Sequence, residues 1–197
     1  IVISSSPHAI SQAHDAVVGC YILPPESYTI HMVVDHREVR SRTSTFMDAR
    51  QQRITFEGAL TQRGVPCELR ALELGDILWV ARPKRDLPPD KKKAWTYVQE
   101  VVLDTVVERK RLDDLASSIF DGRWHDQKQR LRHAGIGQVI YLIEDIDVPH
   151  LMQRHGAQIQ TALSSTQVID GFCVHRTANN QGTVDFLVTL HEAVMDM

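Results

Sequence analysis

The sequence predicts an α/β domain in which helices pack against a central β-sheet. Strand-like apolar runs alternate with helix-like segments along the chain, and this alternation is typical of α/β folds. The apolar runs at residues 30–34 and 139–143 have the length of strands. The chain has 197 residues, of which 43% are hydrophobic and 24% charged, which suits one domain with a sizeable core. We therefore expect a single domain over residues 1–197.

The first half of the chain predicts mainly strands. An apolar run (YTIHMVV) ends at Asp35, and Gly64 marks the end of a helix. Leu74-Gly75 predicts a tight hairpin between two neighbouring strands. The expected order is a strand at 28–34, a loop or helix start at 38–51, a helix at 53–63, and strands at 67–73 and 76–81.

The second half begins with a segment that does not resemble a core element. Residues 82–93 hold three prolines and six basic residues, which predicts a mobile surface loop. Asp121-Gly122 and Gly135 mark the ends of two helices. The expected order after the loop is a β-branched run at 97–107, helices at 112–120 and 124–134, a strand at 138–143, a helix at 153–165, a strand at 168–175 and a helix at 184–194.

Composition excludes several classes of protein. No apolar run approaches the roughly 18–20 residues of a membrane span. The chain opens on Ile1 without a signal peptide, so we expect a fragment of a longer protein. Three widely spaced cysteines (Cys20, Cys67 and Cys173) favour a reducing compartment over a disulfide scaffold. No C-x-x-C or H-E-x-x-H motif indicates zinc.

The charge is distributed unevenly. The net charge is −3, yet residues 37–132 hold 20 of the 22 basic residues against 15 acidic ones. This segment is compatible with a surface that faces phosphate groups. A solvated helix or loop face explains the same charges.

The segment VERKRLDDL at residues 107–115 carries the main chemical signal. Alternate side chains of a strand share a face, so Glu108 and Lys110 point one way and Arg109 the other. A carboxylate at such a position binds a hard cation such as Mg²⁺. The lysine orients or helps to deprotonate an attacking water. The alternative is an exposed Glu108–Lys110 ion pair of little energetic value.

Two further aspartates follow or begin predicted strands. Asp76 starts one strand, and 31 residues separate it from Glu108, an arrangement found in restriction-type nucleases. Asp35 ends the first strand, within the sequence Asp35-His36-Arg37-Glu38. Ligands gather beyond strand ends in open α/β sheets, so we expect these acids to converge. Taken alone, an aspartate in the position of Asp35 is more commonly a turn or helix-cap residue.

These motifs resemble those of one nuclease family. Gly75-Asp76 followed by Glu108-Arg109-Lys110 and Asp114 is similar to the GD…ERKxxxD signature of the XPF (xeroderma pigmentosum group F) family of structure-specific endonucleases. The run at 108–131 (ERKRLDDLASSIFDGRWHDQKQRL) is most similar to the catalytic subunits of crossover-junction endonucleases in that family. The sequences VDHRE at 34–38, VIYLIE at 139–144 and TQVIDGF at 166–172 extend the resemblance over about residues 28–195.

The resemblance implies a restriction-endonuclease-like fold, a central mixed sheet flanked by helices, and Mg²⁺-dependent hydrolysis in which Mn²⁺ can substitute. It implies that Asp76, Glu108 and Asp35 bind metal, with Glu38 beside them, and that Lys110 is the catalytic lysine. Arg109 and Asp114 match family positions needed for activity. The residues alone leave two roles open for Arg109. It either pairs with Asp113 or Asp114 at the helix start, or contacts a phosphate.

The implied substrates are branched DNA duplexes, namely 3′ flaps, replication forks and nicked Holliday junctions, recognised by shape and backbone. Each candidate phosphate contact is equally compatible with a solvated surface. These candidates are Arg123, Lys128, Arg130 and Arg132 on the polar helix after the signature, and Arg40 and Arg42 near Asp35.

The resemblance also implies a nuclear protein that forms a heterodimer with a related non-catalytic subunit, or self-associates as an isolated domain. We expect this fragment to lack the family's C-terminal helix-hairpin-helix domain. A catalytically inactive DNA-binding or dimerisation scaffold of the same fold is the alternative. The joint presence of Asp76, Glu108, Lys110 and Asp114 favours the enzyme. An unrelated phosphate-binding domain would carry GxxxxGK[ST], which the sequence lacks.

Overall fold

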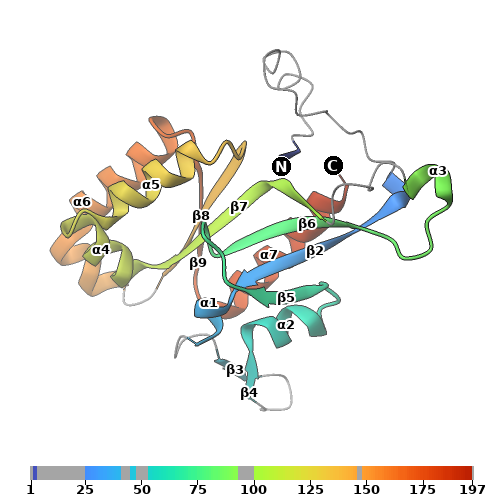
Figure 1. Ribbon diagram of the computed structural model, residues 1–197. Helices are drawn as coiled ribbons and strands as arrows, with labels where there is room; N and C mark the ends of the chain where they lie inside the picture. Colours follow the sequence, from blue (N-terminus) through green and yellow to red (C-terminus); the bar gives the residue numbers. More distant parts are fainter. Residues whose placement is uncertain are drawn as a thin grey trace, which may run out of the picture.

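The computed structural model describes residues 2–3, 25–40, 45–47, 53–92, 100–145 and 148–196. The main sheet has the strand order β5-β2-β6-β7-β8-β9, and β1 also pairs with β7 (Figure 1). Strand β6 is antiparallel to both β2 and β7, whereas the other pairs are parallel. Helices cover both faces, which confirms the predicted α/β class with a mixed central sheet.

The elements of the sheet have the following bounds. The strands are β1 (Val2–Ile3), β2 (Tyr28–Asp35), β5 (Cys67–Arg70), β6 (Ile77–Pro83), β7 (Val101–Arg111), β8 (Gln138–Glu144) and β9 (Cys173–Thr177). The helices are the 3₁₀ turn η2 (Pro25–Ser27), α1 (His36–Arg40), α2 (Phe56–Gln62), α3 (Pro89–Lys92), α4 (Leu112–Phe120), α5 (Arg123–His133), α6 (Val148–Val168) and α7 (Asn180–Met195). A separate small sheet pairs β3 (Thr45–Met47) with β4 (Arg53–Thr55).

Two apolar clusters lie on opposite faces of the main sheet. One joins the sheet to α2 and α7 and includes Val107 and Leu142. The other joins it to α4, α5 and α6 and includes Val106 and Tyr141. Consecutive residues of β7 thus enter different clusters, as the two-residue period of a strand requires. This alternation sets the directions of the charged residues that follow Val107.

The predicted hairpin at Leu74-Gly75 is wrong. Strands β5 and β6 do not pair, because β2 lies between them in the sheet. The segment between them crosses the end of β2. There the Leu72 N–H donates to the Asp35 carboxylate over 2.9 Å, and the Asp35 N–H donates to the Asp76 carbonyl over 2.8 Å. A turn that looks local in sequence is therefore a crossover between non-adjacent strands.

Several other predicted boundaries are corrected. The helix expected from residue 53 begins at Phe56, because Thr55 caps it by accepting a hydrogen bond from the Gly58 N–H over 3.1 Å. The strand expected at 168–175 is shorter and begins at Cys173. Val168 instead ends α6, and Ile169 continues that turn through a hydrogen bond to Ser165. The loop expected at 82–93 contains the end of β6 and the short helix α3.

The described helices also bear on membrane insertion. Among the residues that the structure describes, no helix combines the length and the apolar character needed to cross a bilayer.

Candidate active site

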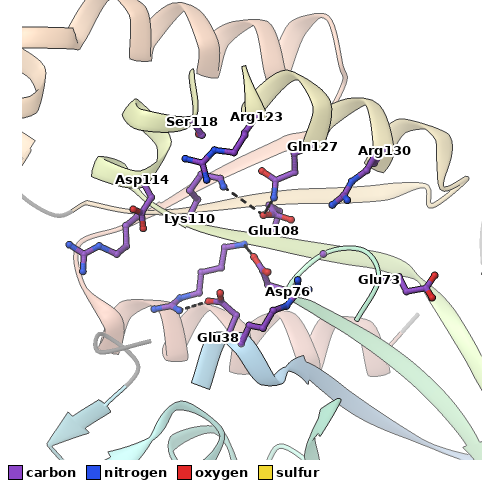
Figure 2. Close-up of a pocket in the computed structure, with 14 residues that line it drawn as sticks. Glu38, Glu73, Asp76, Glu108, Lys110, Asp114, Ser118, Arg123, Gln127 and Arg130 are labelled. Atoms are coloured by element: carbon purple, nitrogen blue, oxygen red, sulfur yellow. Dashed lines mark hydrogen bonds and ion pairs between the residues drawn. The ribbon is translucent and has the colours of Figure 1, made fainter. Parts of the chain in front are cut away.

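The ends of three strands meet beside α1 and α5. The Asp76 N–H donates to the Val107 carbonyl over 2.9 Å, and the Asp76 carbonyl accepts from the Asp35 N–H. These bonds tie the end of β2, the start of β6 and the end of β7 together. A cavity of about 370 Å³ opens at this place (Figure 2). The cavity is lined by Arg37, Glu38, Glu73, Gly75, Asp76, Glu108, Arg109, Lys110, Arg111, Asp114, Ser118, Arg123, Gln127 and Arg130.

Gly75 determines where Asp76 lies. Its φ of +72° is in the left-handed region, which residues with a side chain rarely adopt. A Cβ at this position would lie 2.3 Å from Cγ2 of Val106 on β7. The chain therefore approaches β7 closely only because residue 75 is glycine. This explains in physical terms why glycine precedes the aspartate.

Glu108 and Lys110 project to the same side of β7, as the alternation predicted. Lys110 Nζ lies 3.9 Å from Glu108 Oε1, and both side chains are largely buried, at 15% and 5% exposure. The carboxyl groups of Asp76 and Glu108 both line the cavity, and the charge of Glu108 acts to raise the pKa of Asp76. Asp76 Oδ2 also accepts the Arg109 N–H over 2.8 Å. The alternative of an exposed Glu108–Lys110 pair is therefore wrong.

Burial and mutual repulsion change the acidity of the two carboxylates. Burial raises the pKa of Glu108 to about 7, with Glu38 adding to the shift and Lys110 opposing it. Burial, followed by the charges of Glu108 and Glu38, raises the pKa of Asp76 well above its ordinary value. Burial is the largest cause of both shifts, and the neighbouring acidic charges add to it.

This donor set fits a hard divalent cation. Carboxylate oxygens are the ligands that Mg²⁺ prefers, and Mg²⁺ is commonly bound by one or two carboxylates with water and phosphate completing its shell. A cation would also offset the repulsion between Asp76 and Glu108. Within the described parts of the chain, no three His, Cys, Asp or Glu side chains form a preformed metal cage. The protein would thus supply two carboxylates and leave other positions open.

Arg109 points away from Glu108 and toward α7, so the pairing with Asp113 or Asp114 considered from the sequence is wrong, while contact with a phosphate stays a prediction. Its Nε and Nη2 donate to the two oxygens of Glu144 over 2.9 Å each, and Nη1 donates to Glu38 over 2.6 Å. Asp113 instead pairs with Arg111 over 2.8 Å. Arg109 therefore holds Glu38 at the cavity through its side chain and Asp76 through its backbone.

Asp35 is fully buried but does not line the cavity that the described residues form. It accepts hydrogen bonds from Nε and Nη2 of Arg37, each over 2.8 Å, and from the Leu72 N–H. Burial acts to raise its pKa, but the bonds from Arg37 and Leu72 outweigh burial and hold the pKa at about 2. The side chain of Asp35 therefore holds Arg37 at the cavity and does not join Asp76 there.

The predicted phosphate contacts divide into two groups. Arg123 and Arg130 lie on one face of α5, and both line the cavity. Lys128 and Arg132 lie on another face, where both pair with Asp170 after α6. Arg40 ends α1, with no side-chain position described, and Arg42 lies outside the described residues. Asp114, at the exposed start of α4, lines the cavity.

Sequence reasoning missed Gln127 and Glu144. Gln127 contacts Glu108, and its spacing from Arg123 and Arg130 on a helix was a usable signal. Glu144 is buried and accepts from Arg109 and from the Thr183 hydroxyl. A single charge at the end of an apolar strand was its only sign in the sequence.

The fold that carries this site is of the XPF type. The fold is similar to that of XPF from Aeropyrum pernix, with a TM-score of 0.59 and 24% identity over 83% of this chain and 61% of that one. XPF from Aeropyrum pernix in complex with DNA gives a TM-score of 0.59 and 22% identity over 85% of this chain and 66% of that one. Residues 34–190 match the model of the ERCC4 domain. The chain belongs to the ERCC4 domain family.

Curated relatives are more similar in sequence. Crossover junction endonuclease mus81 of Aspergillus fumigatus is 41% identical over 174 residues, which cover 86% of this chain. Structure-specific endonuclease subunit MUS81 of Mus musculus is 37% identical over 168 residues, covering 85% of this chain. In both comparisons the match covers 28% of the relative's length.

Proposed function

We propose that the chain is the nuclease portion of a metal-dependent endonuclease that hydrolyses phosphodiesters in branched DNA. The observation that carries this proposal is the pair of carboxylates, Asp76 and Glu108, that line one cavity beside Lys110, with arginines around them. The names of the curated relatives, crossover junction and structure-specific endonucleases, support the same reaction class. We favour 3′ flaps, replication forks and nicked Holliday junctions as substrates.

The residues would divide the work as follows. Asp76 and Glu108 would hold the metal, which we take to be Mg²⁺ with Mn²⁺ as a substitute. Bound there, the ion would offset charge on the scissile phosphate and lower the pKa of its water. Lys110 would orient that water and contribute a second positive charge. Attack forms a P–O bond to the water oxygen and breaks one ester P–O bond, so the products are a phosphate end and a hydroxyl end.

The arginines around the cavity would position the DNA. Arg37, Arg123 and Arg130 line the cavity from α1 and α5, and Arg111 lines it from the end of β7. Guanidinium groups bind phosphate oxygens in a forked geometry, which suits recognition of the DNA backbone rather than of base sequence. We assign Arg123 and Arg130 to phosphate contact, whereas the pairing of Lys128 and Arg132 with Asp170 favours a structural role for those two.

A partner and a location complete the proposal. The mouse relative is called a subunit, which supports assembly with another chain. We propose a related non-catalytic subunit as that partner, and the nucleus as the compartment in which branched DNA is processed. The alternative function, an inactive scaffold, is disfavoured because Asp76, Glu108, Lys110 and Asp114 all line one cavity.

Cleavage of a labelled 3′-flap duplex tests the proposal. The chain is assayed alone and with a candidate partner subunit, with Mg²⁺ or Mn²⁺, beside the isosteric variants Asp76→Asn and Glu108→Gln. Asp185→Asn serves as the control, because Asp185 is an exposed carboxylate of α7 paired with Arg63. We expect metal-dependent cutting that both site variants abolish and the control retains. Equal cutting by all variants, or no cutting by the wild type with its partner, contradicts the proposal.

A further inference from the structure

Glu108 is contacted by a neutral side chain that the proposed chemistry does not use. Gln127 of α5 donates a hydrogen bond from Nε2 to Oε1 of Glu108, and Figure 2 shows the two side chains meeting inside the cavity. Lys110 Nζ approaches the same oxygen to 3.9 Å. Two donors therefore converge on Oε1, which leaves Oε2 as the oxygen available to a metal ion.

Helix α5 holds Gln127 in place independently of the site. Trp124, Lys128 and Leu131 are buried on one side of the helix. Lys128 and Arg132 both pair with Asp170, which joins the helix to the turn after α6. These contacts lie on the side of α5 that faces away from the cavity. They therefore fix the position of the Gln127 amide beside Glu108 without the help of other cavity residues.

The same arrangement recurs at Asp76. Its Oδ2 accepts the Arg109 backbone N–H over 2.8 Å, so one oxygen of this carboxylate is also held by a neutral donor. Both carboxylates thus have one oxygen fixed by a neighbouring N–H group. Residues that fix the orientation of metal ligands in this way tune metal affinity without touching the metal.

We infer that Gln127 is a positioning residue that orients Glu108 for metal binding, by holding Oε1 while Oε2 faces the ion. This inference rests on the proposed metal site. An amide suits the role because it donates a hydrogen bond and carries no charge at any pH. A carboxylate at this position would repel Glu108, and an aliphatic side chain would leave Glu108 free to rotate.

Metal binding without DNA gives a test that does not depend on cleavage. Mn²⁺ binding to the 197-residue chain is measured by calorimetry for the wild type, Gln127→Ala and Gln127→Met. The methionine variant keeps roughly the volume of the side chain and removes the amide that donates to Glu108. Gln129→Ala is the matched control, since Gln129 lies on the same helix but does not line the cavity. Thermal unfolding confirms that all variants are folded.

We expect both Gln127 variants to bind Mn²⁺ about tenfold more weakly than the wild type, with Gln129→Ala unchanged. In the cleavage assay, the metal concentration for half-maximal rate should rise by a similar factor while the KM for DNA stays constant. Wild-type Mn²⁺ affinity in Gln127→Met overturns the inference, as does absence of Mn²⁺ binding by the wild type. Weaker Mn²⁺ binding by both Gln127 variants, combined with no DNA cleavage by the wild type and its partner, contradicts the proposed function alone.

Discussion

Arg109 and Glu144 form a buried ion pair with two parallel hydrogen bonds, on the opposite side of β7 from the candidate metal ligand Glu108. The two bonds are 2.9 Å each, and the side chains are 4% and 0% exposed. The same guanidinium bonds to Glu38, and the same carboxylate accepts from Thr183 of α7. One residue of the signature segment is thereby connected to α1, β8 and α7.

Breaking this pair should destabilise the fold. Glu144→Gln keeps the shape of the side chain but leaves Arg109 with less compensating charge in a buried place. We expect the free energy of unfolding to fall by about 3 kcal/mol, as measured by urea denaturation. Asp145→Asn is the control, because its partner Arg176 is more exposed and such pairs contribute about 1 kcal/mol or less. Equal losses for the two variants would contradict the assigned role.

Asp35 should make stability depend on pH in the acid range. Its folded-state pKa of about 2 lies below the ordinary value of 3.8, so the unfolded chain binds more protons between these values. The contribution is complete above about pH 4 and is lost as the pH falls through about 2. Asp35→Asn should lower the free energy of unfolding by about 2 kcal/mol at pH 7 and flatten its decline below pH 4.

This dependence is measured by denaturant unfolding at several pH values with a chelator present. Glu192→Gln, which removes an exposed carboxylate of α7, should retain the wild-type slope. A wild-type slope in Asp35→Asn would show that the Arg37 and Leu72 bonds do not hold the Asp35 carboxyl in its ionised form.

Gly75→Ala should impair both stability and cleavage. The added Cβ would meet Val106 Cγ2 and would also require a left-handed backbone. We expect a loss of about 1–3 kcal/mol in the free energy of unfolding and a large loss of activity, because Asp76 moves with residue 75. Gly64→Ala is a matched control: its φ is +82°, yet nothing lies within 4 Å of the added Cβ. Full activity in Gly75→Ala would refute the close approach.

The two groups of basic residues on α5 should differ in DNA binding. Arg123→Ala and Arg130→Ala should each weaken affinity for a branched duplex and reduce the salt dependence of log Kd by about one unit. Arg132→Ala should leave both quantities near wild type, because Arg132 pairs with Asp170. Fluorescence anisotropy in Ca²⁺, without cleavage, measures these values. Equal effects of Arg130→Ala and Arg132→Ala on DNA affinity would contradict the assignment of DNA contact to only one face of α5.

The sequence predicted what depends on local periodicity. Alternation along β7 placed Glu108 and Lys110 together and Arg109 opposite, and the structure confirms this. The partner of Arg109 could not be predicted, because Glu144 is 35 residues away and meets it only through parallel pairing of β7 with β8. The prediction of a hairpin at Leu74-Gly75 was wrong for the same reason, because β2, much earlier in the chain, lies between the two strands.

The strand predicted from residue 168 was wrong for a different reason. Val168 and Ile169 are residue types that favour strands, yet both are exposed around the end of α6.

The antiparallel pairing of β6 with β7 has a consequence for how such chains vary in length. Ile77 pairs with Val107 at the end of the strands near the cavity, whereas Ala81 pairs with Val101 toward the other end. The connection between the two strands therefore leaves from the end remote from Asp76 and Glu108. Strand register, rather than the number of intervening residues, fixes the separation of the two carboxylates. Insertions or deletions in that connection would therefore leave the separation of the two carboxylates unchanged, so its length can change without moving the site.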